Sequence, residues 1–278
     1  MLNVHSRRTA IVTITLLVAL GFGGRADAGS VIFIDSCQTL SIPNTVYKLT
    51  QDVTAPVGGT CFLIAASRIM LDLQGHTVSA GMMSLSGVLG FGSADLAVIK
   101  NGTVSGFSVG AIVLLANRVS VLGDTVAGAN VDGVNIGVGI DVRGDQALIK
   151  ECDASSASTG IRVTGSRAQV QQCQVHGTGQ GINVAANGSI VTMNIVDGNS
   201  SGISYFGNGT VSSNTVTNNS NEGIFAEATA LITHNVATDN GEDYRIVCPS
   251  TITYNESTDG FPASYILEGD GCHSAHND

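Results

Sequence analysis

Residues 202–222 read GISYFGNGTVSSNTVTNNSNE, and residues 223–243 read GIFAEATALITHNVATDNGED. Both stretches open on Gly-Ile, pass through an apolar residue to an Asn, and close on a polar tail rich in Asn. The same 21-residue spacing extends backward, because Gly-Ile pairs begin at Gly139, Gly160, Gly181, Gly202 and Gly223. A constant period of this length indicates a repeat architecture, in which each unit buries its apolar face against a copy of itself.

Within each unit, short β-branched runs alternate with polar breakers. The first run, G-I-x-V, places apolar residues at alternate positions, as in Ile140 and Val142, which is typical of a strand with one buried face. Two further short apolar runs follow, such as Ile190-Val191 and Ile195-Val196. Three short strands per unit, with no helical stretch between them, predict an all-β, single-stranded solenoid: a parallel β-helix of about eight coils.

Two other solenoids share parts of this pattern. A leucine-rich-repeat horseshoe also has an apolar-x-x-Asn segment, but its apolar positions are Leu, and the G-I-x-V strand has no place in its repeat. Left-handed β-helices are built from hexapeptides and would repeat at about 18 residues. The period of 21 residues therefore favours the right-handed form.

A second column of residues supports the stacking. Alignment on the apolar-x-x-Asn motif superimposes Asn101, Asp124, Cys152, Cys173, Asn194, Asn214, Asn235 and Asn255. Stacked Asn side chains can pass amide hydrogen bonds from coil to coil at the strand spacing of about 4.8 Å. Cys152 and Cys173 would then lie about 5 Å apart at Cα, close enough for a disulfide. The alternative is two stacked free thiols that pack as small apolar groups.

The N-terminal segment is typical of a secretory signal peptide. Two cations, Arg7 and Arg8, precede an apolar run from Ala10 to Phe22 and a small-x-small site at Ala26-Asp27-Ala28. A membrane anchor is the alternative, although the run is shorter than the roughly 20 residues that a span needs. Cleavage after Ala28 removes three of 12 cations and one of 22 anions, leaving a formal charge of −12. We therefore expect a secreted or periplasmic protein with no nucleic-acid partner and no membrane contact after cleavage.

Six cysteines remain after that cleavage, and an even number in an exported chain indicates disulfides. We expect a Cys37–Cys61 bridge on an N-terminal cap of residues 29–60. A Cys248–Cys272 bridge would pin a C-terminal tail at residues 261–278. The β-helix would occupy residues 61–260, with Cys152 and Cys173 as the third candidate pair.

The segments LDLQGHTVSA (71–80) and VIKNGTVSGF (98–107), with the Gly-Ile units, resemble right-handed parallel β-helix proteins of the pectin-lyase-like superfamily. The first two segments are most similar to its NosD-type members. The resemblance covers roughly residues 60–260 and implies the fold. It leaves function open, because this fold hosts lyases, glycosidases, epimerases, binding proteins and non-catalytic modules.

If Ile140 and Val142 point inward, alternate residues form outward columns. These columns are Asp141, Arg162, Asn183, Ser204, Phe225 and Arg143, Thr164, Ala185, Phe206, Glu227. The resemblance implies glycan binding along this face, beside an inserted loop near residues 128–137. The expected carbohydrate-binding residues are Asp141, Arg162, Asn183, Phe206 and Phe225.

Asp141, Arg143 and Arg162 are the candidate catalytic residues on the same face. Asp141 would act as a general acid, a base or a Ca²⁺ ligand. By the resemblance, an Arg would neutralise a uronate or act as the base. The alternative is that Asp141–Arg162 is an exposed ion pair worth under about 1 kcal/mol and that the phenylalanines are a packing patch.

Catalytic motifs of the superfamily are missing from the sequence. Polygalacturonase-like members carry an Asp-Asp pair, Asn-Thr-Asp and Arg-Ile-Lys. The chain has neither of the first two, and Arg245-Ile246-Val247 lacks the Lys of the third. Pectate-lyase-like members carry a Trp-Ile-Asp-His segment, and the chain has no Trp.

Because these motifs are missing, we first expect a non-catalytic or carbohydrate-binding extracellular β-helix whose partner is a polysaccharide or surface glycan. A polysaccharide lyase or glycoside hydrolase is the second hypothesis, and a structural, adhesive or periplasmic assembly protein is the third. No cofactor is evident, Ca²⁺ is possible, and the oligomeric state is open.

Overall fold

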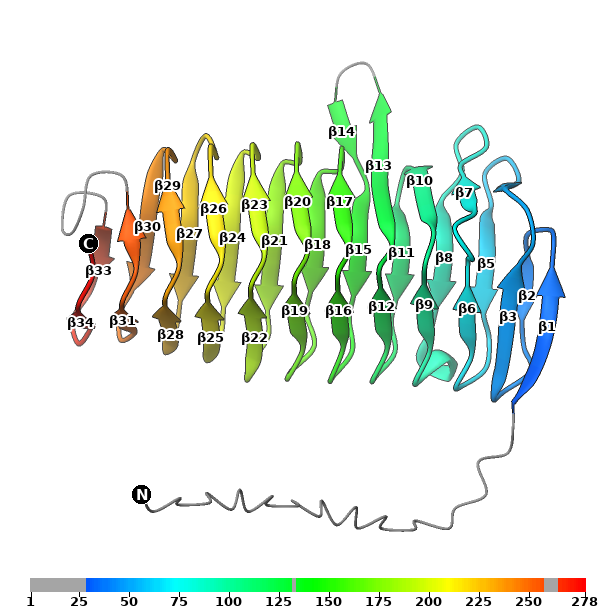
Figure 1. The fold of residues 1–278 in the computed structure, drawn as a ribbon, viewed down its shortest axis with the longest axis horizontal. Coiled ribbons are helices and arrows are strands. Elements are labelled where there is room, and N and C mark those ends of the chain that lie inside the picture. The colour runs from blue at the N-terminus through cyan, green and yellow to red at the C-terminus, as the bar shows by residue number, and fades with distance from the viewer. Residues whose placement is uncertain (1–28, 132–133, 258–264) are drawn as a thin grey trace, which may run out of the picture.

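The computed structural model describes residues 29–131, 134–257 and 265–278, so the predicted signal peptide lies outside the described residues. The described chain winds into a parallel β-solenoid, and successive coils add one strand to each of three sheets (Figure 1). The one helical element within these ranges is a short 3₁₀ turn, η1 (Gly92–Ala94). This confirms the predicted all-β parallel β-helix and excludes the leucine-rich-repeat alternative.

Sheet A has 12 strands in the described ranges, all paired in parallel. They are β1 (Ser30–Ile34), β3 (Thr45–Leu49), β6 (Met70–Asp72), β9 (Val98–Lys100), β12 (Ser120–Leu122), β16 (Leu148–Lys150), β19 (Gln169–Gln171), β22 (Ser189–Thr192), β25 (Gly209–Ser212), β28 (Ala230–Thr233), β31 (Thr251–Thr253) and β34 (His273–Ala275).

Sheet B contains the Gly-Ile strands and has 11 members among the described residues. They are β2 (Gln38–Leu40), β5 (Thr60–Ile64), β8 (Ser86–Gly90), β11 (Gly110–Leu114), β15 (Val138–Val142), β18 (Thr159–Val163), β21 (Gln180–Ala185), β24 (Ser201–Phe206), β27 (Glu222–Glu227), β30 (Glu242–Val247) and β33 (Tyr265–Glu268).

Sheet C completes each coil. Its parallel strands are β4 (Val53–Thr54), β7 (Thr77–Ser79), β10 (Thr103–Phe107), β13 (Thr125–Val131), β17 (Asp153–Ser155), β20 (Gln174–His176), β23 (Ile195–Asp197), β26 (Thr215–Thr217), β29 (Val236–Thr238) and β32 (Glu256–Ser257). The inserted segment near residues 128–137 forms an antiparallel hairpin of β13 with β14 (Val134–Ile136), which projects from the solenoid (Figure 1).

The register superimposes the repeats as the 21-residue period predicts. Ile140 pairs with Ile161, Ile161 with Ile182, and Ile203 with Ile224. These isoleucines are at most 1% exposed, so each coil presents its β-branched side chains to the same residue type above and below. Burial of one such side chain contributes about 1.5–3 kcal/mol, and the stack repeats that contribution along the molecule.

The Gly of each Gly-Ile pair is required by close contact between coils. A Cβ at Gly139 would lie 2.5 Å from the carbonyl oxygen of Gly160, and a Cβ at Gly181 would lie 2.6 Å from that of Gly202. Gly202 faces the Gly223 carbonyl in the same way. Any larger residue would push neighbouring coils apart, which explains why the pair recurs at a constant interval.

The solenoid has about 11 coils, so the prediction of eight was too low. Strands β1–β4, which precede Cys61, hydrogen-bond into the three sheets, and β33 and β34 do the same after residue 264. The motifs used for counting do not recur in these segments, although their backbones follow the same path. The boundaries between coils and caps at residues 60/61 and 260/261 stay predictions.

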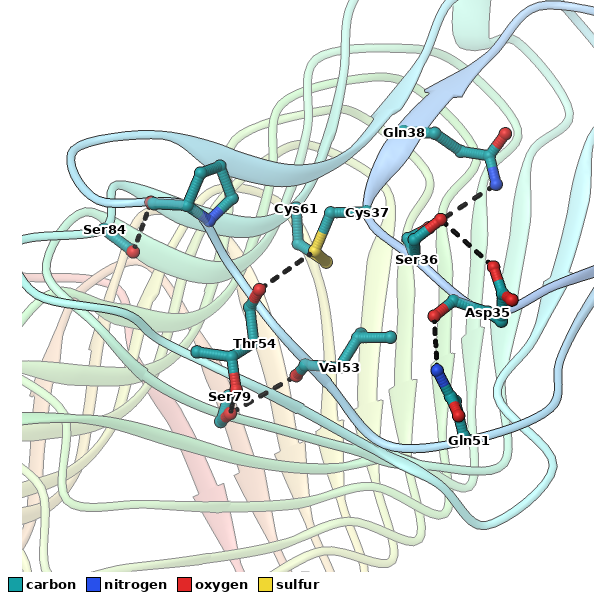
Figure 2. Close-up of a disulfide and its surroundings, with 11 residues drawn as sticks. Asp35, Ser36, Cys37, Gln38, Gln51, Val53, Thr54, Cys61, Ser79 and Ser84 are labelled. Carbon is teal, nitrogen blue, oxygen red and sulfur yellow. Dashed lines mark hydrogen bonds between the residues drawn. A yellow bond between two sulfur atoms is a disulfide. The ribbon is translucent and has the colours of Figure 1, made fainter.

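Two disulfides join neighbouring coils near the two ends, as predicted. Cys37 is bonded to Cys61 across a Cα–Cα distance of 4.5 Å (Figure 2), and Cys248 is bonded to Cys272 across 4.9 Å. The Cys37 sulfur also lies 3.5 Å from the Thr54 carbonyl oxygen of the next segment. Each bridge restrains a terminal coil that has a neighbour on one side, and such links typically contribute about 2–4 kcal/mol.

A ladder of buried Asn side chains runs along the turns between sheets A and C. The backbone N–H and the side-chain Nδ2 of Asn194 both donate to Asn214 Oδ1, at 3.0 and 2.9 Å. Asn214 in turn donates from Nδ2 to the Val191 carbonyl at 3.0 Å, and Asn235, Asn255 and Asn277 continue the pattern. The predicted column is thus confirmed from Asp124 onward. Its first member is not Asn101, because the register aligns Gly102 with Asp124.

Cys152 and Cys173 occupy two positions of this ladder as free thiols, so the third predicted bridge is not formed. Both are buried. Cys173 Sγ lies 3.8 Å from the Ile149 carbonyl and Cys152 Sγ lies 3.5 Å from the Val121 carbonyl, the places that Asn Nδ2 atoms take in later coils. Each thiol therefore replaces an Asn side chain, which gives both sulfurs polar contacts without a bond between them.

Asp124 occupies the ladder position before the cysteines and is 1% exposed. Its Oδ1 accepts the Gly102 N–H at 2.9 Å, whereas its Oδ2 has no hydrogen-bond partner. Burial raises the pKa of Asp124 to about 7, against backbone hydrogen bonds from Gly102 and Leu122 that lower it. In the register of sheet A, Ile99 pairs with Val121, whose carbonyl is the acceptor one coil later. The Ile99 carbonyl would therefore accept the side-chain N–H of an Asn at position 124.

We predict that Asp124→Asn stabilises the protein at neutral pH. Burial favours the neutral carboxyl, so the stability that this form provides is complete below the unfolded pKa of 3.8 and is lost as pH rises through about 7. The stability difference between variant and wild type should therefore grow from pH 4 to 7, by at most about 1.4 kcal/mol per pH unit, and then level off. Chemical unfolding across pH 3–9 measures it, with Asp270→Asn as the exposed control; a difference that is independent of pH contradicts the prediction.

The thiols give a second prediction. The native protein should react slowly with a thiol reagent, since Cys152 and Cys173 are at most 2% exposed, and the unreduced, unfolded chain should titrate two thiols. Mass spectrometry of alkylated peptides locates them. No titratable thiol would mean that the two cysteines are bridged.

Candidate functional site

The outward face of sheet B carries the predicted column of polar and aromatic residues. Asp141 pairs with Arg162, Arg162 with Asn183, Asn183 with Ser204, and Ser204 with Phe225. The column continues to Arg245, which pairs with Phe225. The strands of this sheet therefore set these side chains in a row parallel to the solenoid axis.

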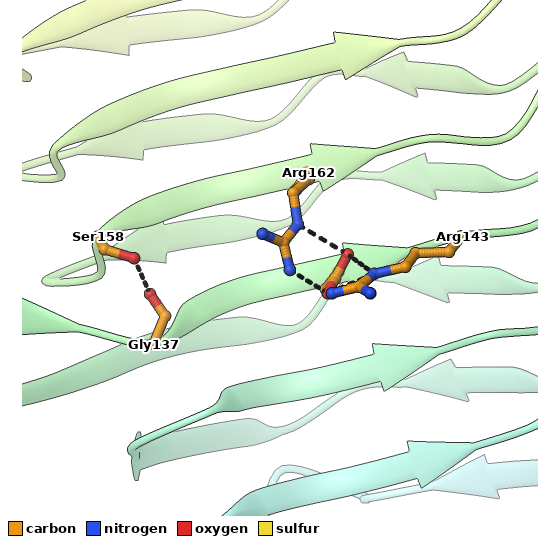
Figure 3. A network of polar contacts seen from close by, with 5 residues as sticks. Gly137, Arg143, Ser158 and Arg162 are labelled. Carbon is orange, nitrogen blue, oxygen red and sulfur yellow. Dashed lines mark hydrogen bonds and ion pairs between the residues drawn. The ribbon is translucent and has the colours of Figure 1, made fainter.

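Arg143 and Arg162, both labelled in Figure 3, donate hydrogen bonds to Asp141. Arg162 Nε donates to Asp141 Oδ1 at 3.0 Å and its Nη2 donates to Oδ2, while Arg143 Nη2 donates to Oδ2 at 2.8 Å. The carboxylate is only 3% exposed, whereas the Arg143 and Arg162 side chains are 48% and 32% exposed. Asp141–Arg162 is therefore not an exposed pair; it is a buried carboxylate held by two partly solvated guanidinium groups.

This geometry determines the protonation of Asp141. Burial opposes its ionisation, but hydrogen bonds from Arg162 and Arg143 outweigh burial and hold the pKa of Asp141 below its usual value. An ionised carboxylate whose two oxygens already accept hydrogen bonds has no proton to donate. The arrangement suits a rigid link between two coils, and a catalytic role for Asp141, Arg143 or Arg162 stays a prediction.

A groove of about 500 Å³ opens on the same face, nearer the C-terminal end. Phe206 and Phe225 lie in it side by side, with ring centroids 5.4 Å apart and planes tilted by 59°. Gln180, Ser201 and Ser204 add amide and hydroxyl groups to the lining. The groove thus combines a partly exposed aromatic surface with neutral hydrogen-bonding groups.

Charged residues from three coils border the phenylalanines. Arg245 Nε donates to Glu268 Oε1 at 2.8 Å, and its Nη1 lies 3.5 Å from Glu222 Oε1. The Arg245 guanidinium also stands over the Phe225 ring, 6.0 Å from its centroid. Glu227 lines the groove as well and is exposed.

The structure brings together part of the predicted carbohydrate-binding set. Phe206 and Phe225 line the groove, whereas Asp141, Arg162 and Asn183 lie outside its lining, on earlier coils of the same sheet. Sequence reasoning missed Gln180, Glu222, Arg245 and Glu268. For Arg245 a signal existed, because Tyr244-Arg245-Ile246 takes the place of Ile224-Phe225-Ala226 in the next coil.

Two further observations concern metals and membranes. No group of three or more His, Cys, Asp or Glu side chains that could hold a metal ion occurs in the described ranges. In the part of the chain that the structure describes, no helix has the length and apolar character that crossing a membrane requires.

Comparison with known proteins supports the fold. A family model described as a right handed beta helix region matches residues 129–260. The Dettilon tailspike protein (gp208) superposes with a TM-score of 0.67 at 14% identity, covering 88% of this chain and 59% of the tailspike. No curated protein sequence matches the chain.

Two solved epimerases share the architecture at similar identity. The mannuronan C-5 epimerase AlgE4 A-module of Azotobacter vinelandii superposes with a TM-score of 0.60 at 13% identity, over 83% of this chain and 68% of the module. The periplasmic alginate epimerase AlgG superposes with a TM-score of 0.52 at 13% identity, over 86% of this chain and 70% of that one. At these identities the likeness concerns the fold alone.

Asp141→Asn should destabilise the protein by about 1–3 kcal/mol at pH 7, because it removes the charge to which two guanidinium groups donate. The depressed pKa of Asp141 means that its contribution is present above the unfolded pKa of 3.8 and is lost as pH falls through the lower folded pKa. The difference in stability between variant and wild type should therefore shrink as the pH falls below 3.8 and through the lower folded pKa. Asp270→Asn is the exposed control, and a variant as stable as wild type at pH 7 would contradict the structural role.

Proposed function

Since the chain is a right-handed parallel β-helix protein with the pectin-lyase-like fold, we propose that it binds a glycan along the outward face of sheet B. The observation that carries the proposal is the groove in which Phe206 and Phe225, from neighbouring coils, stand beside neutral polar side chains. Binding sites in general combine apolar surface with a few convergent polar groups.

The lining suits a sugar ring in particular. The C–H faces of a pyranose can pack on the partly exposed rings of Phe206 and Phe225. Gln180, Ser201 and Ser204 both donate and accept hydrogen bonds, as sugar hydroxyls require. Because the columns run along the solenoid axis, an extended chain of sugars could continue past Asn183 toward Arg162 and Arg143.

The solved structures with this fold are consistent with such a ligand. Two of them are named as epimerases of alginate or mannuronan, which are polysaccharides. Their likeness to this chain concerns the fold. It is consistent with a polysaccharide ligand and does not identify the glycan. Two disulfides and the predicted signal peptide support an exported protein, either secreted or periplasmic.

A second candidate function is cleavage or modification of a glycan in the same groove. Glu222, Glu227 and Glu268 all line it, and glycoside hydrolysis needs two carboxylates on either side of one bond. Ca²⁺ could assist through carboxylate oxygens, so assays should include it. A structural, adhesive or periplasmic assembly role is the third candidate, and it predicts no glycan binding.

We expect Phe225→Ala to weaken glycan binding roughly three- to tenfold, the cost of one aromatic contact. Residues 29–278 are screened against a polysaccharide panel with and without Ca²⁺, and reducing ends and unsaturated products are measured in parallel. Phe91→Ala removes an exposed Phe from another turn and should leave binding unchanged. Equal binding by Phe225→Ala and wild type would refute glycan binding in the groove. Formation of reducing ends or unsaturated products would favour cleavage or modification of the glycan, the second candidate function.

A further inference from the structure

The groove beside Phe206 and Phe225 has an unbalanced charge. Glu222, Glu227 and Glu268 line it, and Arg245 is the one cation among the described residues of the lining. The whole chain also carries a formal net charge of −10. A ligand in this groove therefore meets a negative potential from its immediate surroundings and from the protein as a whole.

Arg245 is not free to offset that potential. Its guanidinium donates to Glu268 at 2.8 Å, lies 3.5 Å from Glu222, and stands over the Phe225 ring. Two carboxylates thus compete with any anionic ligand for its N–H groups. A uronate in the groove would have to displace one of them or remain without a cationic partner.

Glu227 is the carboxylate best placed to meet a ligand. It is exposed, and it makes no ion pair within the described part of the chain. In the register of sheet B it pairs directly with Phe206, and on its own strand it follows Phe225 by two residues, on the same face. Its carboxylate therefore borders the aromatic surface on which a sugar would pack.

We infer that the groove selects glycans containing free amino sugars over neutral and uronate glycans. The inference rests on the proposed glycan-binding function and adds the chemical class of the ligand. The ammonium group of a ring packed on Phe206 and Phe225 would pair with Glu227, while the sugar hydroxyls would meet Gln180, Ser201 and Ser204. A uronate polymer would be repelled by the same groups.

The test compares three hexasaccharides of matched length by isothermal titration calorimetry: glucosamine, N-acetylglucosamine and mannuronate oligomers. Titrations with residues 29–278 are made at mildly acidic pH, where the amines are protonated, in low and high salt. We expect the glucosamine hexamer to bind about fivefold more tightly than the acetylated one in low salt, the effect of one exposed ion pair, and this ratio should shrink in high salt. The mannuronate hexamer should bind most weakly.

Variants separate this inference from the proposed function. Glu227→Gln should lower the preference for glucosamine while binding of the acetylated oligomer persists, and Glu256→Gln, which removes the same charge at an exposed site on sheet C, should lower it much less. Equal affinities for the amino and acetylated oligomers, or tightest binding of mannuronate, would overturn the preference for amino sugars but leave glycan binding in the groove standing. If no hexamer binds, or if Phe225→Ala binds all three like wild type, the glycan-binding function itself fails.

Discussion

The structure depends on one constraint: no coil can bury its apolar face or satisfy its backbone except against the next coil. Ile140 and its equivalents become buried because identical residues stack in register, and Gly139 and its equivalents allow backbones to approach within contact distance. Hydrogen bonding follows the same rule, since the ladder side chains accept N–H groups from the preceding coil. The 21-residue period is therefore the length of chain that returns each residue type to its own position above the previous coil.

This constraint also explains how the outward face of sheet B is organised. Because side chains alternate along each strand, the residues next to the inward apolar positions point outward. The outward residues of successive coils therefore line up in columns parallel to the solenoid axis. On earlier coils the columns contain Asp141 between Arg143 and Arg162, a cluster of one carboxylate and two guanidinium groups that has a net charge of +1 and joins two coils. On later coils they contain Phe206 and Phe225 among carboxylates, with Arg245 held by two of them. A surface with one polar cluster and one aromatic groove follows from a single repeating backbone.

Sequence reasoning reached the fold, the register of sheet B and two disulfides because each depends on a period or on residue type. It failed where contacts depend on side-chain direction or where the repeat decays. Asn101 was placed in the ladder because an apolar-x-x-Asn alignment tolerates a shift of one residue that the strand register does not. The burial of Asp141 depends on two long arginine side chains folding over it. Arg245 and Glu268 were missed because Tyr244 replaces the Ile of the motif and β33 follows a segment with no motif.

The hydrogen-bond ladder between sheets A and C has a direction. Gly102, Cys173, Asn194 and Asn214 each donate a backbone N–H to a side chain that arrives one coil later in the chain. In a chain that grows from its N-terminus, each of these backbone donors therefore gains its side-chain acceptor only when the next coil is added. The ladder is polar as a result, because each coil provides the acceptor for a buried backbone donor of the coil before it.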